Sequence, residues 1–376
     1  MKFSFSDEQA EFRTMLRRFL EDKSPTTEVR RLMATDAGHD RQVWHQLSQD
    51  LGLTAIHIPE AYGGQGFGVS ELAIAVEEMG RALLCAPYFA STVMAATAIM
   101  KAGSETQKQA LLPGIAAGET IATLALAEDS GQWNVEGIAM TAAVSGGKAT
   151  LDGRKSFVLD GASADLLVVA ARRPGSSGSD GVSLFTVAGD APGIDRTLLK
   201  SVDATRKIAR ITFTGVEAEL LGDEGAAADA LGETLDVAAI CLANEMAGGA
   251  ERLLEDAIDY AKMRVQFGRS IASFQSLKHK AADMLLDVEL AKSAAYYAAA
   301  AVDDGDEDVP AMASLAKAGA ADAYMQTAIH AVQIHGGIGF TWDNDTHLWF
   351  KRAKSSEVFL GGSAYHRERL MQHWNV

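Results

Sequence analysis

The pattern of apolar and polar positions divides the chain into three stretches. From Ser6 to about Gly118, apolar residues recur at the three- and four-residue spacing of an amphipathic helix, as they do across residues 12–19. Ser6, with Gln9 three residues later, has the sequence of a capping box, which predicts a helix that begins directly after Ser6. The segment 59–66, PEAYGGQG, is a turn-rich break before further helical pattern.

Short runs of β-forming residues replace this pattern between about Glu119 and Gly222. Clusters of Gly, Asp, Ser and Pro separate the runs, which lie at 121–126, 148–151, 166–170, 182–187 and 209–213. Regular strand runs with turn signals between them predict a small β-barrel or sandwich. The stretch 173–181, RPGSSGSDG, predicts an exposed loop.

Long helical patterns return from about Asp223, at 227–260, 274–301 and 311–334, with an acidic connection at 303–310. The pattern therefore predicts an α+β protein with three domains. An α-helical domain spans 1–118, a β-domain spans 119–222, and an α-helical bundle spans 223–376.

Composition fits this organisation and excludes several partners. The chain has 376 residues, more than one hydrophobic core usually holds, and its 48% hydrophobic and 22% charged residues are typical of globular proteins. A net charge of −16 and a pI near 5.0 repel phosphate backbones and anionic lipid, so nucleic acid and membranes are not expected partners. Any polyanionic ligand must therefore be held by local cations and backbone N–H groups.

Neither the cysteines nor the histidines suggest a metal site. Cys85 and Cys241 match no metal or redox spacing, and we expect two buried, reduced thiols in a cytoplasmic protein. The histidines at 330, 335, 347 and 366 have no zinc-ligand spacing. Residues 1–8 lack the apolar core of a signal peptide, and the apolar run 237–243 is too short to span a bilayer.

Four segments, in order and spacing, resemble the acyl-CoA dehydrogenase family along the whole chain. They are PEAYGGQG at 59–66, RVQFG at 264–268 with SFQ at 273–275, QIHGGIGF at 333–340, and KRAK at 351–354. The resemblance implies an N-terminal helical domain, a middle β-barrel and a C-terminal four-helix bundle. It also implies FAD, acyl-CoA substrates, a tetramer, and an electron-transfer flavoprotein as electron acceptor.

The resemblance also assigns a clamp for FAD. In the family, these segments grip the adenosine diphosphate half of an FAD whose flavin lies in the neighbouring subunit. A guanidinium pairs with phosphate bidentately, and glycines without Cβ let backbone N–H groups approach a ligand closely. The resemblance carries the cofactor-binding role to Arg264, Gln266, Phe267, Gln275, Gln333, His335, Gly336 and Gly337. The alternative is a helix C-cap followed by a turn, with Phe267 in the core.

The segments expected at the flavin depart from the family pattern. The family's Thr-Glu-Pro-Gly segment reads AEDS at 127–130, so Ala127 replaces a hydroxyl donor. The family's Trp-Ile-Thr-Asn-Gly segment reads FVLDG at 157–161, so Phe157 replaces the tryptophan and Leu159 stands where a threonine often meets the flavin. Only backbone N–H groups of these two segments remain as flavin partners.

The usual catalytic base is missing too. Dehydrogenation needs a carboxylate within reach of the substrate's α-proton, and the family's Tyr-Glu-Gly-Thr segment supplies it. Here that segment is FLGG at 359–362, and Leu360 cannot take a proton. Glu357 lies one helical turn earlier. Some relatives place the base on the first C-terminal helix, near Ala238 and Ala239; the nearest acids are Asp236, which needs a helix bulge to reach, and Glu245, about two turns further on.

Three functions remain open. In the first, the chain is the non-catalytic, FAD-clamping partner in a heterotetrameric acyl-CoA dehydrogenase. The clamp residues are kept while the residues at the flavin and the base are altered, and this pattern favours that function. It then resembles the shorter subunits of α2β2 acyl-CoA dehydrogenases of steroid side-chain degradation, including the KRAK run at 351–354. Alternatively, it is a complete homotetrameric dehydrogenase with a displaced base, Glu245 or Asp236, or an acyl-CoA-binding protein without dehydrogenase activity. The reaction of the assembly is α,β-dehydrogenation of an acyl-CoA to the trans-2-enoyl-CoA.

Overall fold

A computed structural model of the chain describes residues 5–376. The first four residues, part of the segment predicted to lack a signal peptide, lie outside the described part. The chain forms two compact units. The first comprises Met1–Arg30, Val69–Leu84 and Ala239–Val376; the second comprises Arg31–Gly68 and Cys85–Ala238. The helical first third of the chain is therefore divided between the two units.

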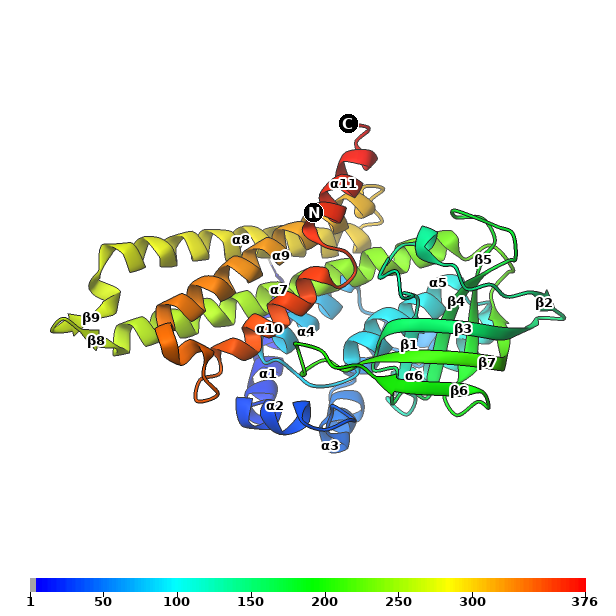
Figure 1. Cartoon of the computed structure of the whole chain (residues 1–376), viewed down its shortest axis with the longest axis horizontal. Helices are drawn as coiled ribbons and strands as arrows, with labels where there is room; N and C mark the ends of the chain where they lie inside the picture. Colours follow the sequence, from blue (N-terminus) through cyan, green and yellow to red (C-terminus); the bar gives the residue numbers. More distant parts are fainter. Residues whose placement is uncertain (1–4) are drawn as a thin grey trace. The chain divides into compact units, whose positions relative to one another are not determined.

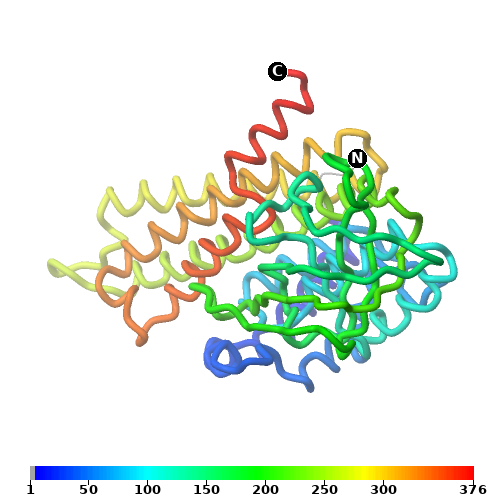
Figure 2. Tube along the Cα trace, turned by 45° about the vertical axis from the view of Figure 1, so that its right-hand side comes forward, coloured from blue at the N-terminus to red at the C-terminus, as the bar shows by residue number. Residues whose placement is uncertain are grey.

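The first unit is helical and is built around long C-terminal helices. Its helices are α1 (Asp7–Lys23), α4 (Val69–Arg81), α7 (Ala228–Met263, which begins in the second unit), α8 (Gln275–Asp303), α9 (Val309–His335), α10 (Thr346–Val358) and α11 (Ser363–His373). α8 and α9 run side by side, as both views show (Figures 1 and 2). The predicted capping box is confirmed, because Ser6 Oγ accepts from Gln9 N–H and Gln9 Oε1 accepts from Ser6 N–H.

Close helix approaches in this unit depend on glycine. A Cβ at Gly80 of α4 would lie 2.1 Å from the backbone oxygen of Glu245 in α7, and one at Gly248 of α7 would lie 2.0 Å from the backbone oxygen of Glu77 in α4. Neither backbone oxygen can move without its helix. The absence of side chains at Gly80 and Gly248 therefore sets the distance between α4 and α7.

The second unit holds the sheet. Its strands are β1 (Ala122–Ala125), β2 (Val144–Ser145), β3 (Lys148–Leu159), β4 (Leu166–Arg172), β5 (Val182–Ala188), β6 (Ile194–Leu198) and β7 (Ile208–Leu221). They form one seven-stranded sheet in the order β1-β4-β5-β7-β3-β2, with β6 on β7; β1 and β4 are parallel and the other pairs are antiparallel. Ser156 N–H also donates to the Ala127 carbonyl at 2.8 Å, so β3 curls back toward the segment that follows β1.

Short helices complete the second unit. They include α3 (Arg41–His45), the π-helical η4 (Phe89–Ala96), α5 (Thr97–Ala102) and α6 (Glu105–Ala116), while α2 (Thr26–Met33) spans the boundary between the units. The Ser91 hydroxyl of η4 accepts from Ala122 N–H at 3.0 Å and ties this helix to β1. The five predicted strand runs are all present, and the predicted loop at 173–181 connects β4 to β5. The sequence pattern missed β2 and β6.

Candidate functional site: an exposed clamp and a base position without a carboxylate

A β-hairpin carries the first group of predicted clamp residues. α7 ends at Met263, and β8 (Val265–Gln266) pairs with β9 (Arg269–Ser270). The two turn residues, Phe267 and Gly268, have φ of 54° and 77°, as a two-residue type I′ hairpin requires. The helix does end just before Arg264 and a turn follows, as the alternative interpretation has it, and the segments on either side of the turn pair as a hairpin.

Phe267 lowers the stability of the fold through its left-handed backbone conformation and through the exposure of its apolar ring. Its left-handed backbone costs a residue with a Cβ about 1–2 kcal/mol. Its side chain is 91% exposed, so the interpretation that places it in the core is also wrong. The ring meets only the edge of Phe274, with centroids 6.1 Å apart, and the Arg269 guanidinium lies 4.2 Å above the Phe274 ring. A strained, exposed aromatic residue at a hairpin tip is typical of a surface that contacts a ligand or another chain.

Arg264 leads into this hairpin with an unengaged side chain. It is exposed, and its guanidinium forms no ion pair or side-chain hydrogen bond with any residue in 5–376. In a chain of net charge −16, an unpaired guanidinium is available to an anion. Gln266 and Gln275 are exposed as well, Gln266 in the hairpin and Gln275 at the start of α8.

The second group of clamp residues lines a groove at the end of α9. Gln333, Gly336 and Gly337 lie there together with the apolar side chains of Ile329, Val332, Phe340 and Phe350, around a volume of about 570 Å³. Gly336 has φ of 65°, and a Cβ at Gly336 or Gly337 would meet nothing within 4 Å. Backbone is thus exposed to a ligand over two consecutive residues.

His335 ends α9 directly before Gly336 and is not among the residues that line the groove. Its side chain is buried, its Nδ1 lies 2.8 Å from the Ala331 carbonyl oxygen, and its ring stacks on Tyr260 of α7 with centroids 4.3 Å apart. The stack ties the end of α9 to the last turns of α7, which lead into the hairpin. Tyr260 was not among the predicted site residues; its position, four residues before Arg264, was the only signal that could have found it.

Together these residues fit the adenosine diphosphate half of FAD. The hairpin offers an unpaired guanidinium and an exposed aromatic ring, and the groove offers apolar walls, one amide and a backbone without Cβ. Aromatic and apolar surfaces suit a purine ring, while guanidinium and backbone N–H groups suit phosphate.

The segments expected at the flavin have a different character. Ala127 and Leu159 are buried and offer no side-chain hydrogen bond, and Phe157 has φ of 58°. Asp129, at the position of the family's proline, accepts from the Ser156 hydroxyl at 2.5 Å and pairs with Arg154. The Ser156 hydroxyl bond and the nearby arginines lower the pKa of Asp129, so this carboxyl is ionised at neutral pH.

A buried lysine orders the same segment. Lys155 Nζ donates to the Leu126 carbonyl at 3.0 Å and to Glu128 Oε1 at 2.7 Å, and burial lowers the pKa of Lys155 to about 8. Glu128 also accepts from the backbone N–H of Met140 at 2.9 Å. The charged side chains of this segment thus bond to one another and to nearby backbone groups. They take the place of the hydroxyl groups that the family pattern has here.

The loop at the usual base position is firmly held around an apolar side chain. Leu360 is buried and has φ of 58°. Lys317 Nζ donates to the carbonyls of Glu357 and Gly361 at 2.7 and 2.5 Å, and His366 Nε2 lies 2.9 Å from the Leu360 carbonyl. Burial lowers the pKa of Lys317 to about 7. No carboxylate occupies the loop position where the family places one.

The alternative carboxylates are found in other surroundings. Glu245 Oε1 is 3.0 Å from Arg352 Nη1, and both side chains are buried. Glu357 pairs with Lys354 at 2.6 Å near the surface. Asp236 is buried on α7, which is continuous α-helix from Ala228 to Met263 without the bulge that Asp236 would need.

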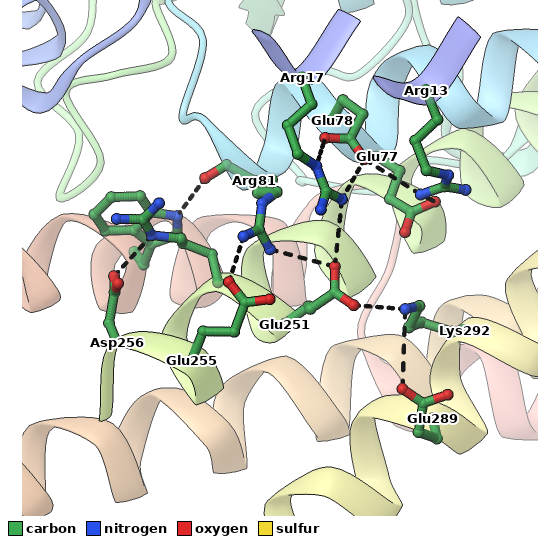
Figure 3. A network of polar contacts seen from close by, with 12 residues as sticks. Arg13, Arg17, Glu77, Glu78, Arg81, Glu251, Glu255, Asp256, Glu289 and Lys292 are labelled. Atoms are coloured by element: carbon green, nitrogen blue, oxygen red, sulfur yellow. Dashed lines mark hydrogen bonds and ion pairs between the residues drawn. The ribbon is translucent and has the colours of Figure 1, made fainter. Parts of the chain in front are cut away.

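Further buried carboxylates of the first unit belong to a polar network between helices (Figure 3). Arg13 and Arg17 of α1 reach Glu77 and Glu78 of α4 at 2.8 and 2.7 Å. The Tyr296 hydroxyl donates to Glu77 at 2.7 Å, and burial raises the pKa of Glu77. Each of these carboxylates has a cation beside it, so the network joins α1 to α4 and offers no unpaired base.

Neither a metal site nor a membrane span is found in residues 5–376. Those residues contain no cluster of three or more His, Cys, Asp or Glu side chains suited to a metal ion. Among them, no helix has the length and apolar character needed to cross a membrane. Cys85 and Cys241 are both buried.

Comparison with known proteins identifies the family of this chain. The models of the acyl-CoA dehydrogenase N-terminal, middle and C-terminal domains match residues 6–119, 123–216 and 228–374. Acyl-CoA dehydrogenase IpdE2 of Mycobacterium tuberculosis is 34% identical over 88% of this chain and 86% of its own length.

Solved structures agree with the family models. The butyryl-CoA dehydrogenase of Megasphaera elsdenii is 28% identical, with a TM-score of 0.93 over the whole of both chains. A chain of the ChsE4-ChsE5 complex from Mycobacterium tuberculosis is 26% identical, with a TM-score of 0.90 over 100% of this chain and 99% of that one. The predicted fold, helical N-terminal region, middle sheet and C-terminal helices, is confirmed. The protein belongs to the acyl-CoA dehydrogenase family.

Proposed function

We propose that this chain is the FAD-clamping, non-catalytic subunit of a heteromeric acyl-CoA dehydrogenase. The observation that carries the proposal is the contrast between two regions. Apart from His335, the clamp residues are exposed, and Arg264 is unpaired, whereas the base loop is closed around Leu360. The partner subunit supplies the flavin surface and the carboxylate, and this chain supplies the adenosine-side contacts.

The substrate of the assembly is an acyl-CoA thioester. A carboxylate takes the proton from the α-carbon, and the reaction yields the trans-2-enoyl-CoA. Bound FAD would supply the hydride acceptor for the β-carbon, and an electron-transfer flavoprotein is the expected acceptor of the electrons. A bulky, steroid-linked acyl group is the expected class, because a chain of the Tcur3481-Tcur3483 steroid acyl-CoA dehydrogenase is 30% identical over 98% of both chains.

In this assembly the residues of the present chain bind and orient the cofactor. Arg264 pairs with the pyrophosphate, Phe267 covers an apolar face of the cofactor, and the backbone at Gly336 and Gly337 approaches the adenosine half. By holding the adenosine diphosphate half of FAD, these residues fix the position of the flavin without contacting the reacting atoms. The exposure of Phe267 and Phe340, at 91% and 71%, is then relieved by cofactor and partner.

The alternative is a complete homotetramer that uses Glu245 or Asp236 as base. The Arg352 guanidinium at 3.0 Å gives Glu245 a structural partner, and the regular α7 leaves Asp236 without the bulge it needs. These observations favour the heteromer. A third possibility, an acyl-CoA-binding protein without dehydrogenase chemistry, leaves the strained and exposed clamp unexplained.

Substitution of Arg264 tests the proposed role. The chain is co-expressed with a catalytic acyl-CoA dehydrogenase subunit as its partner, FAD is removed and re-titrated, and flavin fluorescence gives the affinity. We expect Arg264→Met to weaken FAD binding about 10- to 100-fold, as the loss of a charge-assisted hydrogen bond does, while turnover per bound FAD stays unchanged. Arg367→Met is the matched control, because Arg367 is an exposed arginine that pairs with Asp322 on the same unit. Unchanged FAD affinity in Arg264→Met would contradict the assignment.

A further inference from the structure

We propose that Lys280 is a positioning residue of the clamp, which fixes the side-chain amide of Gln333 so that its NH2 group is presented to the adenosine diphosphate half of the cofactor. The inference rests on the proposed function, since it requires that the clamp binds a nucleotide. It adds a residue outside the four segments that resemble the family.

The evidence begins with one contact between two helices. Lys280 lies on α8 and Gln333 lies on α9, 53 positions later in the sequence. The Lys280 Nζ is 2.5 Å from Gln333 Oε1. A hydrogen bond to an ammonium group is charge-assisted and about twice as strong as a neutral one. The contact therefore joins α8 and α9 at the edge of the groove.

Donor and acceptor chemistry then settles the orientation of the amide. An ammonium group has three N–H donors and no acceptor, whereas a glutamine amide has an accepting oxygen and a donating NH2 group. Only the oxygen of Gln333 can meet Lys280. The two N–H bonds of Gln333 are left for the groove and its ligand.

The orientation of the Gln333 amide suits a nucleotide bound in the groove. Gln333 is the one polar side chain among the residues that line it, and the other side chains there are aliphatic or aromatic. Nucleotides offer acceptor atoms, namely ring nitrogens and phosphate oxygens, and an amide that presents N–H groups complements them. An amide turned the other way would present its oxygen to the same acceptors and repel them.

The charged groups near Lys280 make a cation favourable at this position. Lys280, Asp283 and Asp287 of α8 each lie close enough to His330 of α9 to interact with it electrostatically. Of these three charged groups, Lys280 is the cation and the other two are carboxylates. Lys280 is thus a cation with carboxylates nearby, in a chain whose net charge is already −16.

The test is a double-mutant cycle on the assembled dehydrogenase. Lys280→Met, Gln333→Met and the double variant are compared for FAD affinity by fluorescence titration of the apoprotein, and for ADP affinity by competition. Lys280→Met and Gln333→Met are each expected to weaken FAD and ADP about tenfold. If Lys280 acts through Gln333, the double variant is no weaker than Gln333→Met alone.

Three further variants separate positioning from other effects. Lys280→Arg, which keeps a donor, should stay within about threefold of the wild type. Gln333→Glu keeps the partner of Lys280 but removes the NH2 group, so it should bind FAD more weakly than Gln333→Met. Lys278→Met, on the same helix two residues earlier and exposed, is the control and should leave the affinity unchanged. Binding of FMN, which lacks the adenosine half, should not respond to any of them.

Two results would overturn the inference. Unchanged ADP and FAD affinity in Lys280→Met would remove any role of Lys280 in the clamp. Losses that multiply in the double variant would show that Lys280 acts by its charge alone and not through Gln333. A wild-type assembly that binds neither FAD nor ADP would instead contradict the proposed function itself, and the two failures are thus distinguishable.

Discussion

Replacing Glu245 by glutamine tests whether its carboxylate serves stability or catalysis. The carboxylate lies 3.0 Å from the Arg352 guanidinium, and the two side chains are 8% and 4% exposed. At that separation, the attraction between unit charges is about 5 kcal/mol at an effective dielectric constant near 20. The cost of taking both charges out of water offsets much of it. The variant itself, however, leaves Arg352 buried without its counter-charge.

We therefore expect Glu245→Gln to lower the free energy of unfolding by about 3–5 kcal/mol, the usual cost of breaking a buried pair by removing one partner. Urea unfolding followed by far-UV circular dichroism measures this loss. The double variant Glu245→Met, Arg352→Met removes both charges and should recover much of the stability. Glu255→Gln is the matched control on the same helix, because Glu255 pairs with Arg81 near the surface and should cost less than about 1 kcal/mol.

Activity decides between the two roles. In the assembled dehydrogenase, turnover per folded, FAD-loaded site should be unchanged in Glu245→Gln once the loss of folded protein is accounted for. If Glu245→Gln abolished turnover while the free energy of unfolding stayed within about 1 kcal/mol of the wild type, Glu245 would be the base, and the structural interpretation of its pair with Arg352 would be refuted.

Three further results are expected. Leu360→Glu places a carboxylate where the family has one, yet it should give this chain no dehydrogenase activity of its own, because the flavin-face hydroxyl groups are still missing; a gain of turnover with acyl-CoA would argue for a complete homomer. Gly248→Ala should lower the free energy of unfolding by about 1–3 kcal/mol, because its Cβ would collide with the backbone of α4, and urea unfolding measures it. Burial lowers the pKa of both His57 and His366 to about 4, so below pH 6.5 the unfolded chain binds protons that the folded chain does not. Stability should therefore fall as the pH drops from about 6.5 to 4, by about 1.4 kcal/mol per pH unit for each histidine. His366→Gln should remove one histidine's share of that slope in urea titrations at several pH values, and an unchanged slope would contradict this account.

Much of the fold could be predicted because local signals and tertiary structure agree. The Ser6–Gln9 capping box, the five strand runs and the three long C-terminal helices are all encoded within a few residues of where they form. β6 was missed because its exposed and half-buried residues alternate without a strong apolar face. The division of the helical first third between two units could not be predicted, because it depends on which distant helices α1 and α4 contact.

The candidate site was predicted less completely. The positions of the clamp residues came from motifs, but the hairpin at 265–270 did not, because a phenylalanine is a poor residue for the first position of a type I′ turn. The partners of Glu245, Gln333 and the Leu360 loop are long-range as well. Arg352, Lys280 and Lys317 lie 107, 53 and about 40 positions away, and no local pattern connects such pairs.

The most direct test of the central claim is the FAD content of this chain alone and of the chain co-expressed with a catalytic acyl-CoA dehydrogenase subunit as its partner. The visible flavin spectrum and the protein concentration give the ratio. A non-catalytic clamp predicts little or no FAD on this chain alone and about one FAD per pair of unlike chains in the complex. One FAD per chain in a homomer, bleached by an acyl-CoA, would contradict the proposal and return the search for a base to Glu245 and Asp236.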